Sequence, residues 1–129
     1  MRFWYVIFFV FLFAVACDDV SFSPLVGKWQ LKTVEKNGVI VPVDTVWYNF
    51  QSISVFLLQI YAPHNDAFIA FEGTRTQDGK VVSIQLNNEW VVYQSDWNST
   101  ARSFTIETVD RKKLRLRSEE GYLYSFIKF

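Results

Sequence analysis

Short runs of β-branched and aromatic residues, separated by turn signals, make up the chain from residue 26 onward. Hydrophobic and polar positions alternate in several runs: Phe104 and Ile106 stand between polar neighbours, and Leu114 and Leu116 are interleaved with lysine and arginine. A period of two places one set of side chains on a core face and the other in water. No window sustains an apolar repeat of 3.6 residues over several turns. The pattern therefore predicts an all-β domain.

Turn signals divide this domain into eight or nine strands. Asn37-Gly38 and Asp78-Gly79 are the strongest, because both central residues of a type I′ hairpin turn need a positive φ. The expected strands span residues 26–36, 45–50, 53–61, 67–77, 80–86, 90–94, 103–109, 113–118 and 122–129, with a bend near 51–52. Many short antiparallel strands joined by tight turns indicate a barrel or a sandwich.

The first predicted strand favours the barrel. It opens with Gly27-Lys28-Trp29, a Gly-x-Trp pattern that resembles the entry motif of lipocalin-like proteins. The end of the chain, with Phe104-x-Ile106, Leu114-x-Leu116 and then Tyr124 to Phe129, is similar to the closing hairpin of short lipocalin-like lipoproteins of bacterial envelopes. The resemblance implies a small up-and-down barrel of about eight strands over residues 26–129. It also implies that Gly27 and Trp29 close one end of the barrel by packing.

The first sixteen residues have the pattern of a secretory signal peptide. Arg2 supplies a positive start, and residues 3–16 are apolar, a run too short to span ~30 Å of hydrocarbon comfortably. Small residues then precede Cys17, the chain's only cysteine, which resembles a bacterial lipobox. An uncleaved anchor and an ordinary signal peptide are the alternatives. The lipobox predicts a mature protein that begins at a lipidated Cys17.

A lipid on Cys17 would hold the domain on a membrane through residues 17–25 as a tether. Buried acyl methylenes contribute about 0.8 kcal/mol each, so several chains such as palmitate make a stable anchor. We therefore expect a protein of the bacterial cell envelope, at the outer membrane, on its periplasmic or surface face.

Composition excludes several classes of partner. Cleavage removes only Arg2 from 13 basic residues, which leaves 12 against 13 acidic ones, so a nucleic-acid partner is not expected. With Cys17 lipidated, no thiol remains for a disulfide or a metal site. The single histidine, His64, lies in the turn 63–66 without a second histidine, so we expect neither a metal nor a cofactor.

No catalytic residues are predicted. The carboxylates are scattered among turns and polar strand faces, and no pair is singled out for general acid–base work. The serines lack a local nucleophile motif such as Gly-x-Ser-x-Gly. A binding protein is therefore expected rather than an enzyme.

Three segments are apolar on both strand faces: Trp47–Phe50, Phe56–Leu58 and Phe68–Phe71. They could line a ligand pocket, form a partner surface, or be fully buried. Trp90 and Trp97 lie near predicted strand ends, where amphipathic rings suit a barrel mouth. The candidate ligand-binding residues are Tyr48, Phe56, Leu58, Phe71, Trp90 and Trp97.

One basic cluster, residues 111–117, precedes Glu119-Glu120. Its alternating part, Lys113, Arg115 and Arg117, fits the wet face of a strand. It could also contact anionic headgroups or an acidic polysaccharide, although the adjacent glutamates would oppose a purely electrostatic role.

The leading prediction is non-enzymatic binding of a small apolar or amphipathic ligand in or at the mouth of the barrel. The alternative is an accessory module that docks another envelope protein. Interior volume distinguishes the two: an enclosed cavity of ~300 Å³ or more favours the ligand, and a packed interior favours docking.

Overall fold

The computed structural model describes residues 25–62 and 66–129. The predicted signal peptide, Cys17 and the tether up to residue 24 lie outside this range, as does His64. The elements are β1 (Gly27–Lys36), β2 (Val39–Pro42), β3 (Val46–Phe50), β4 (Val55–Ala62), β5 (Ala67–Asp78), β6 (Val81–Leu86), α2 (Val91–Gln94), β7 (Ala101–Val109), β8 (Lys113–Ser118) and β9 (Leu123–Lys128).

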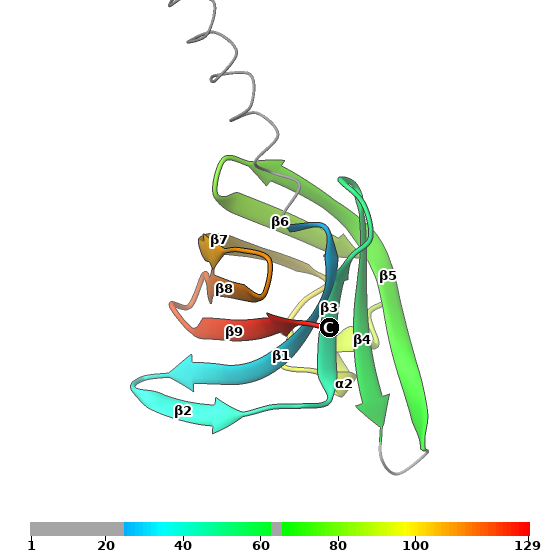
Figure 1. The fold of residues 1–129 in the computed structure, drawn as a ribbon. Coiled ribbons are helices and arrows are strands. Elements are labelled where there is room, and N and C mark those ends of the chain that lie inside the picture. The colour runs from blue at the N-terminus through cyan, green and yellow to red at the C-terminus, as the bar shows by residue number, and fades with distance from the viewer. Residues whose placement is uncertain (1–24, 63–65) are drawn as a thin grey trace, which may run out of the picture.

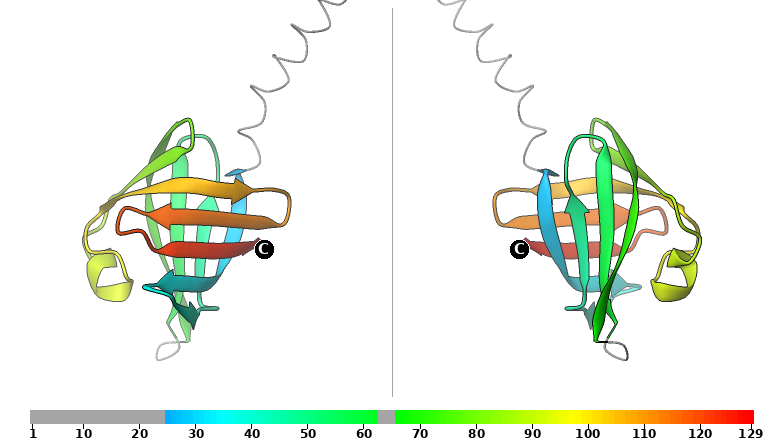
Figure 2. Two further views of the ribbon diagram at one scale, coloured as in Figure 1. Left: turned by 90° about the vertical axis from the view of Figure 1, so that its left-hand side faces the viewer. Right: turned by 90° about the vertical axis from the view of Figure 1, so that its right-hand side faces the viewer.

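A closed antiparallel barrel forms because the first and last strands pair (Figure 1). The sheet order is β2-β1-β3-β4-β5-β6-β7-β8-β9, and β1 also bonds to β9. Eight strands, β1 and β3–β9, therefore make up the wall, as Figure 2 shows from two sides. The predicted all-β, up-and-down barrel is confirmed.

The β1–β2 hairpin extends the wall at one end. The first half of β1 pairs with β3, from Gly27 opposite Phe50 to Gln30 opposite Trp47. Its second half pairs on the same edge with β2, from Thr33 opposite Pro42 to Lys36 opposite Val39. The four residues of β2 are all exposed. This hairpin therefore overhangs one mouth of the barrel.

The two predicted hairpin turns are both present, with different geometry. Asn37 and Gly38 have φ values of 52° and 80°, the positive pair that a type I′ turn requires. In the second hairpin Asp78 pairs with Val81, so the two-residue loop begins at Gly79. Only Gly79 has a positive φ there, 61°, the pattern of a type II′ turn. The predicted position was therefore one residue early.

Two segments differ from the sequence expectation. Residues 90–94 form no strand, because the Asn88 side chain accepts a 2.9 Å hydrogen bond from the Trp90 backbone N–H and starts the short helix α2. Only Val91 of this helix is buried. The strand Val39–Pro42 was not expected, although its β-branched residues follow the predicted hairpin turn directly. The helix therefore follows from a local turn, and the additional strand follows from its pairing with β1.

The barrel interior is filled by side chains from every wall strand. The alternation is clean in β8, where Leu114, Leu116 and Ser118 point inward between exposed basic residues. The largest buried side chains are aromatic: Trp29, Tyr48, Phe50, Phe56, Trp97, Phe104, Tyr124 and Phe126. Burial of this apolar area, at ~25 cal/mol per Å², is the main stabilising term for the fold.

Trp29 closes the end where the chain enters. Its ring is fully buried, and its indole N–H donates a 3.0 Å hydrogen bond to the Leu25 carbonyl. The Lys128 ammonium lies 4.5 Å from the ring centroid and donates to the Val26 carbonyl at 3.0 Å. Gly27 has φ of +143°, and a Cβ there would lie 2.1 Å from Lys128 Nζ. The structure therefore places Gly27 and Trp29 in the packed closed end.

Candidate functional site

The mouth opposite Trp29 contains a pocket of about 190 Å³. Its apolar wall comes from β1, β3, β4 and the β2 overhang: Leu31, Val34, Val41, Val43, Val46 and Leu58. Its polar lining is confined to Lys36, Ser95 and Asp96. The pocket can therefore accept an apolar group of a bound molecule, with the Lys36 and Asp96 side chains beside that group.

The segment between β6 and β7 plugs the mouth behind this pocket. Trp97, 1% exposed, reaches into the interior and packs against Tyr48, Phe56 and Phe104. Its indole N–H donates a hydrogen bond to the Tyr48 hydroxyl. Val91, from α2, is also fully buried. The plug fills the space that a larger ligand cavity would need.

A buried polar network ties this plug to the wall. The Arg102 guanidinium donates to the Tyr124 hydroxyl at 2.5 Å and lies 3.4 Å from the Asp96 carboxylate. The Tyr124 hydroxyl donates to the other Asp96 oxygen. Glu120 adds a second carboxylate 3.8 Å from Arg102. Asp96 therefore belongs both to the pocket and to the network.

Arg102 is 7% exposed and is surrounded by aromatic rings. Its guanidinium carbon lies 4.8 Å from the Tyr124 centroid, 4.9 Å from Phe104 and 5.6 Å from Trp97. Such cation–π contacts stabilise a desolvated cation. Its Nε has no hydrogen-bond partner among the described residues.

Tyr48, which bonds to the plug, and Tyr124, which belongs to the network, both stay protonated at neutral pH. Burial raises the pKa of Tyr48 far above its ordinary value, and the nearby Asp96 charge adds to the effect. Burial also raises the pKa of Tyr124, as does its hydrogen bond to Asp96. Both phenols therefore remain hydrogen-bond donors or acceptors in their neutral form, which suits their role in tying the plug to the wall.

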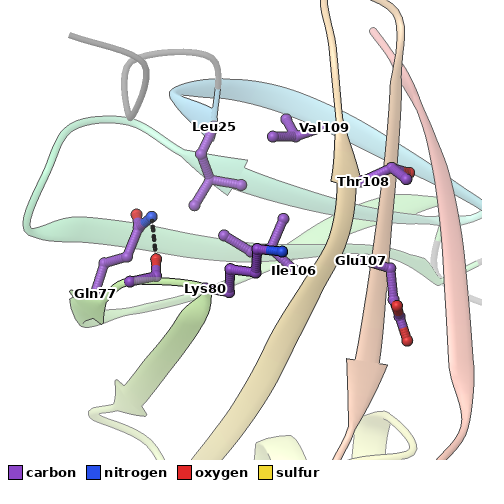
Figure 3. Close-up of a pocket in the computed structure, with 8 residues that line it drawn as sticks. Leu25, Gln77, Lys80, Ile106, Glu107, Thr108 and Val109 are labelled. Atoms are coloured by element: carbon purple, nitrogen blue, oxygen red, sulfur yellow. Dashed lines mark hydrogen bonds between the residues drawn. The ribbon is translucent and has the colours of Figure 1, made fainter. Parts of the chain in front are cut away.

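A second pocket, of about 210 Å³, lies near the closed end (Figure 3). Leu25, Ile106 and Val109 form its apolar part. Gln77 borders it and donates a 3.1 Å hydrogen bond to the Gly79 carbonyl, drawn as the dashed line in Figure 3. Its charged members, Lys80 and Glu107, lie on the outer side of the wall.

The comparisons with known proteins agree with this architecture. Residues 10–129 match the model of a family described as a lipocalin-like domain. The chain belongs to this lipocalin-like domain family. A lipocalin-like protein from Bacteroides uniformis is 31% identical, with a TM-score of 0.73 over 82% of this chain and 99% of its own. An uncharacterized protein from Bacteroides eggerthii is 26% identical, with a TM-score of 0.69 over 81% and 98%. No curated protein matches the chain.

This lipocalin-like domain places the predicted ligand-binding residues in different environments. Tyr48, Phe56, Phe71 and Trp97 are core residues, at most 3% exposed. Leu58 is buried and also lines the mouth pocket. Trp90 is 64% exposed, and its ring lies 6.0 Å from that of Tyr93 on α2. The structure therefore brings five of the six predicted residues together in the filled interior and leaves Trp90 outside it.

The polar mouth residues were not predicted from the sequence. Lys36 lies far along the chain from Asp96, and the two line one pocket only when the barrel closes, whereas Asp96 and Arg102 are six positions apart. The single available signal was the position of Arg102: it lies two residues from Phe104 on the inward face of a strand. A charged residue at a core position predicts a buried polar network.

The described residues contain neither a cluster of metal ligands nor a membrane-spanning helix. In residues 25–62 and 66–129, no three or more histidine, cysteine or acidic side chains are grouped to hold a metal ion. Over the same ranges, no helix has the length and apolar character that a membrane span requires.

Proposed function

We propose that this lipocalin-like domain is a lipid-anchored protein of the bacterial envelope that binds the apolar end of a small amphipathic ligand, without catalysis. The mouth pocket carries this proposal. Valine and leucine side chains line one side of it, and Lys36 and Asp96 stand at its edge. A ligand with an apolar end and a polar head matches that division.

The size of the pocket limits what it can enclose. Its volume of about 190 Å³ is below the ~300–1,000 Å³ of pockets that enclose drug-sized ligands. The interior behind it is occupied by Trp97 and its aromatic neighbours. The ligand would therefore insert only a short aliphatic chain or one ring, and its remainder would lie along the exposed β2 overhang.

Binding of short n-alkyl carboxylates and n-alkyl amines, followed by ligand-observed NMR, tests the pocket. Each added methylene should strengthen binding by about 0.8 kcal/mol until the pocket is full. Affinity should then stop rising. Val43→Trp, which fills the pocket, should abolish binding. Val81→Trp is the matched control, because Val81 is 43% exposed on β6 and away from the mouth. Affinity without chain-length dependence, or equal loss in both variants, would refute this site.

The anchor rests on Cys17 and on the small residues that precede it, Ala14 and Ala16. Mass spectrometry of the mature N-terminus, isolated from envelopes, should find an acylated Cys17 and no residues before it. An unmodified Cys17, or a retained leader, would refute the lipid anchor and leave the pocket proposal standing.

A second candidate function, docking of an envelope protein, is favoured by an aromatic cluster on the outer wall. Trp47 packs against Phe68 at 5.5 Å and against Phe129 at 5.8 Å between centroids. Phe68 and Phe129 are 63% and 68% exposed, although an outer barrel face is normally polar. By the interior-volume criterion given above, the filled interior favours docking over a ligand enclosed inside the barrel, so the ligand proposal concerns the mouth pocket alone.

Photo-cross-linking in envelopes tests the docking candidate. A photoreactive residue at position 68 or 129 should give one discrete cross-linked product, while the same residue at exposed Tyr93 should not. Identical products from all three positions would remove this candidate.

A further inference from the structure

The largest hollow lined by residues that the structure describes lies on the outer wall. Its volume is about 510 Å³, and it spans β1, β9, β8 and the end of β7. The left view of Figure 2 shows these four strands side by side. Its lining includes the exposed Lys113 and Arg115 and the half-buried Lys32. This basic groove is unrelated to the mouth pocket.

The floor of the groove is one row of residues across four strands. Thr108 is opposite Arg115, Arg115 is opposite Ser125, and Ser125 is opposite Thr33. Three of these four side chains are short and carry a hydroxyl. Short side chains leave the row hollow, and each hydroxyl can both donate and accept hydrogen bonds.

Two β-bulges border the row. The β1–β9 register shifts between Leu31 and Thr33, and the β7–β8 register shifts between Ile106 and Thr108. A bulge adds one unpaired residue, bends its strand and re-aims a side chain. In β1 the added residue is Lys32, which is thereby brought to the groove.

The groove lining carries more positive than negative charge. Within the part of the chain that the structure describes, the three ion pairs involve Arg102 and Arg117, and none involves Lys32, Lys113 or Arg115. The one acidic lining residue, Asp110, already accepts 2.7 Å hydrogen bonds from the backbone N–H groups of Lys112 and Lys113. The groove lining therefore has three positive side chains and one carboxylate, and that carboxylate is already hydrogen-bonded to the backbone.

The acidic pair that follows the basic cluster lies elsewhere. Glu119 and Glu120 stand beyond the far end of β8 from Lys113, about six residues or about 20 Å along the strand. Glu119 accepts a hydrogen bond from the Ser103 N–H, and Glu120 faces Arg102. That separation exceeds the ~8 Å Debye length at physiological salt, so the two glutamates do not cancel the field at the groove.

We infer that this groove is a binding site for an anionic sugar, with its sulfate or phosphate groups on Lys32, Lys113 and Arg115 and its hydroxyls on Thr33, Ser125 and Thr108. Cations on both sides of the hollow suit a ligand with more than one anionic group. The hydroxyl floor suits a hydroxylated ligand rather than a bare ion. The volume fits about one or two sugar rings.

The test uses a heparin-derived tetrasaccharide and the full chain purified in detergent, near physiological ionic strength. Arg115→Gln should raise Kd about tenfold or more, because one charge-assisted contact is lost. Lys80→Gln removes one positive charge at the turn between β5 and β6, outside the groove lining, and should leave Kd within about twofold. Ser125→Leu should abolish binding, because the larger side chain fills the hollow while the charge of the groove stays unchanged.

Two small probes distinguish the sources of the anion. Inorganic sulfate and glycerophosphoglycerol, the soluble headgroup of an anionic phospholipid, should each compete only weakly against the tetrasaccharide. Equal affinity of either probe would overturn the assignment to a sugar. No binding by the unmodified chain, or equal weakening by Arg115→Gln and Lys80→Gln, would overturn the site itself.

Discussion

The indole N–H of Trp97 lies 3.1 Å from the hydroxyl of Tyr48, on the opposite side of the barrel interior. These residues are 49 positions apart, and both are at most 1% exposed. The bond satisfies the donor of the tryptophan that plugs the mouth. It therefore couples the loop between β6 and β7 to the wall strand β3.

Tyr48→Phe should lower the free energy of unfolding by about 1–3 kcal/mol, because it leaves the Trp97 N–H buried without a partner. Denaturant unfolding followed by tryptophan fluorescence measures this change. Tyr93→Phe is the control, because Tyr93 is 80% exposed and its change should be within about 0.5 kcal/mol. Equal stability of the two variants would show that the bond contributes nothing.

The domain should lose stability at alkaline pH. Burial raises the pKa of Tyr48 and of Tyr124 above the ordinary value of 10.0. Above about pH 10 the unfolded chain releases these protons while the folded domain keeps them. The stabilising contribution is complete below pH 10 and declines as pH rises, by up to about 1.4 kcal/mol per pH unit for each tyrosine.

Denaturant midpoints measured between about pH 9 and about pH 11.5 test this dependence. Tyr48→Phe should make the decline shallower, because one of the two coupled protons is removed. Tyr93→Phe should leave the slope unchanged. A Tyr48→Phe slope identical to that of the unmodified domain would contradict the assignment.

The strand pattern was predictable because burial acts at every second residue. In β7, β8 and β9 the inward residues follow that period over most of each strand, and the sequence shows it directly. The helix α2 was not predictable. The segment from Trp90 to Gln94 is short and rich in valine and aromatic residues, which favours a strand, and its helical conformation depends on a turn started by Asn88.

The candidate site was predicted only in part. Leu58 was expected to contact a ligand and does line the mouth pocket. Lys36 and Asp96 were not expected there, because their meeting requires the pairing of β1 with β9 and the path of the β6–β7 loop. The basic groove has the same origin: residues 32, 113–115 and 125 become neighbours through strand register, which a single sequence does not encode locally.

Trp29→Ala should destabilise the domain by about 3–5 kcal/mol, because it removes a fully buried ring and leaves a cavity at the closed end. The Leu25 carbonyl would also lose its donor. Differential scanning calorimetry or denaturant unfolding measures the loss. Trp90→Ala is the matched control, since Trp90 is 64% exposed and should cost less than about 0.5 kcal/mol. Equal costs would show that Trp29 does not close the barrel.

The backbone of β6 leaves no room for a side chain at Gly73 on β5. A Cβ at this position would lie 2.1 Å from the Gln85 carbonyl oxygen and 2.8 Å from the Leu86 Cα, both backbone atoms that cannot swing aside. Gly73→Ala should therefore force the strands apart and cost about 1–3 kcal/mol, although alanine is otherwise favoured over glycine in a strand. Thr74→Ala, the adjacent outward-facing position, is the control and should change stability by less than about 0.5 kcal/mol.

Amide hydrogen exchange locates the effect: protection should fall at the paired residues Thr74 and Gln85 in the Gly73 variant and stay unchanged in β8. An alanine variant as stable as the unmodified domain, with full protection in β5 and β6, would show that this contact does not restrict residue 73.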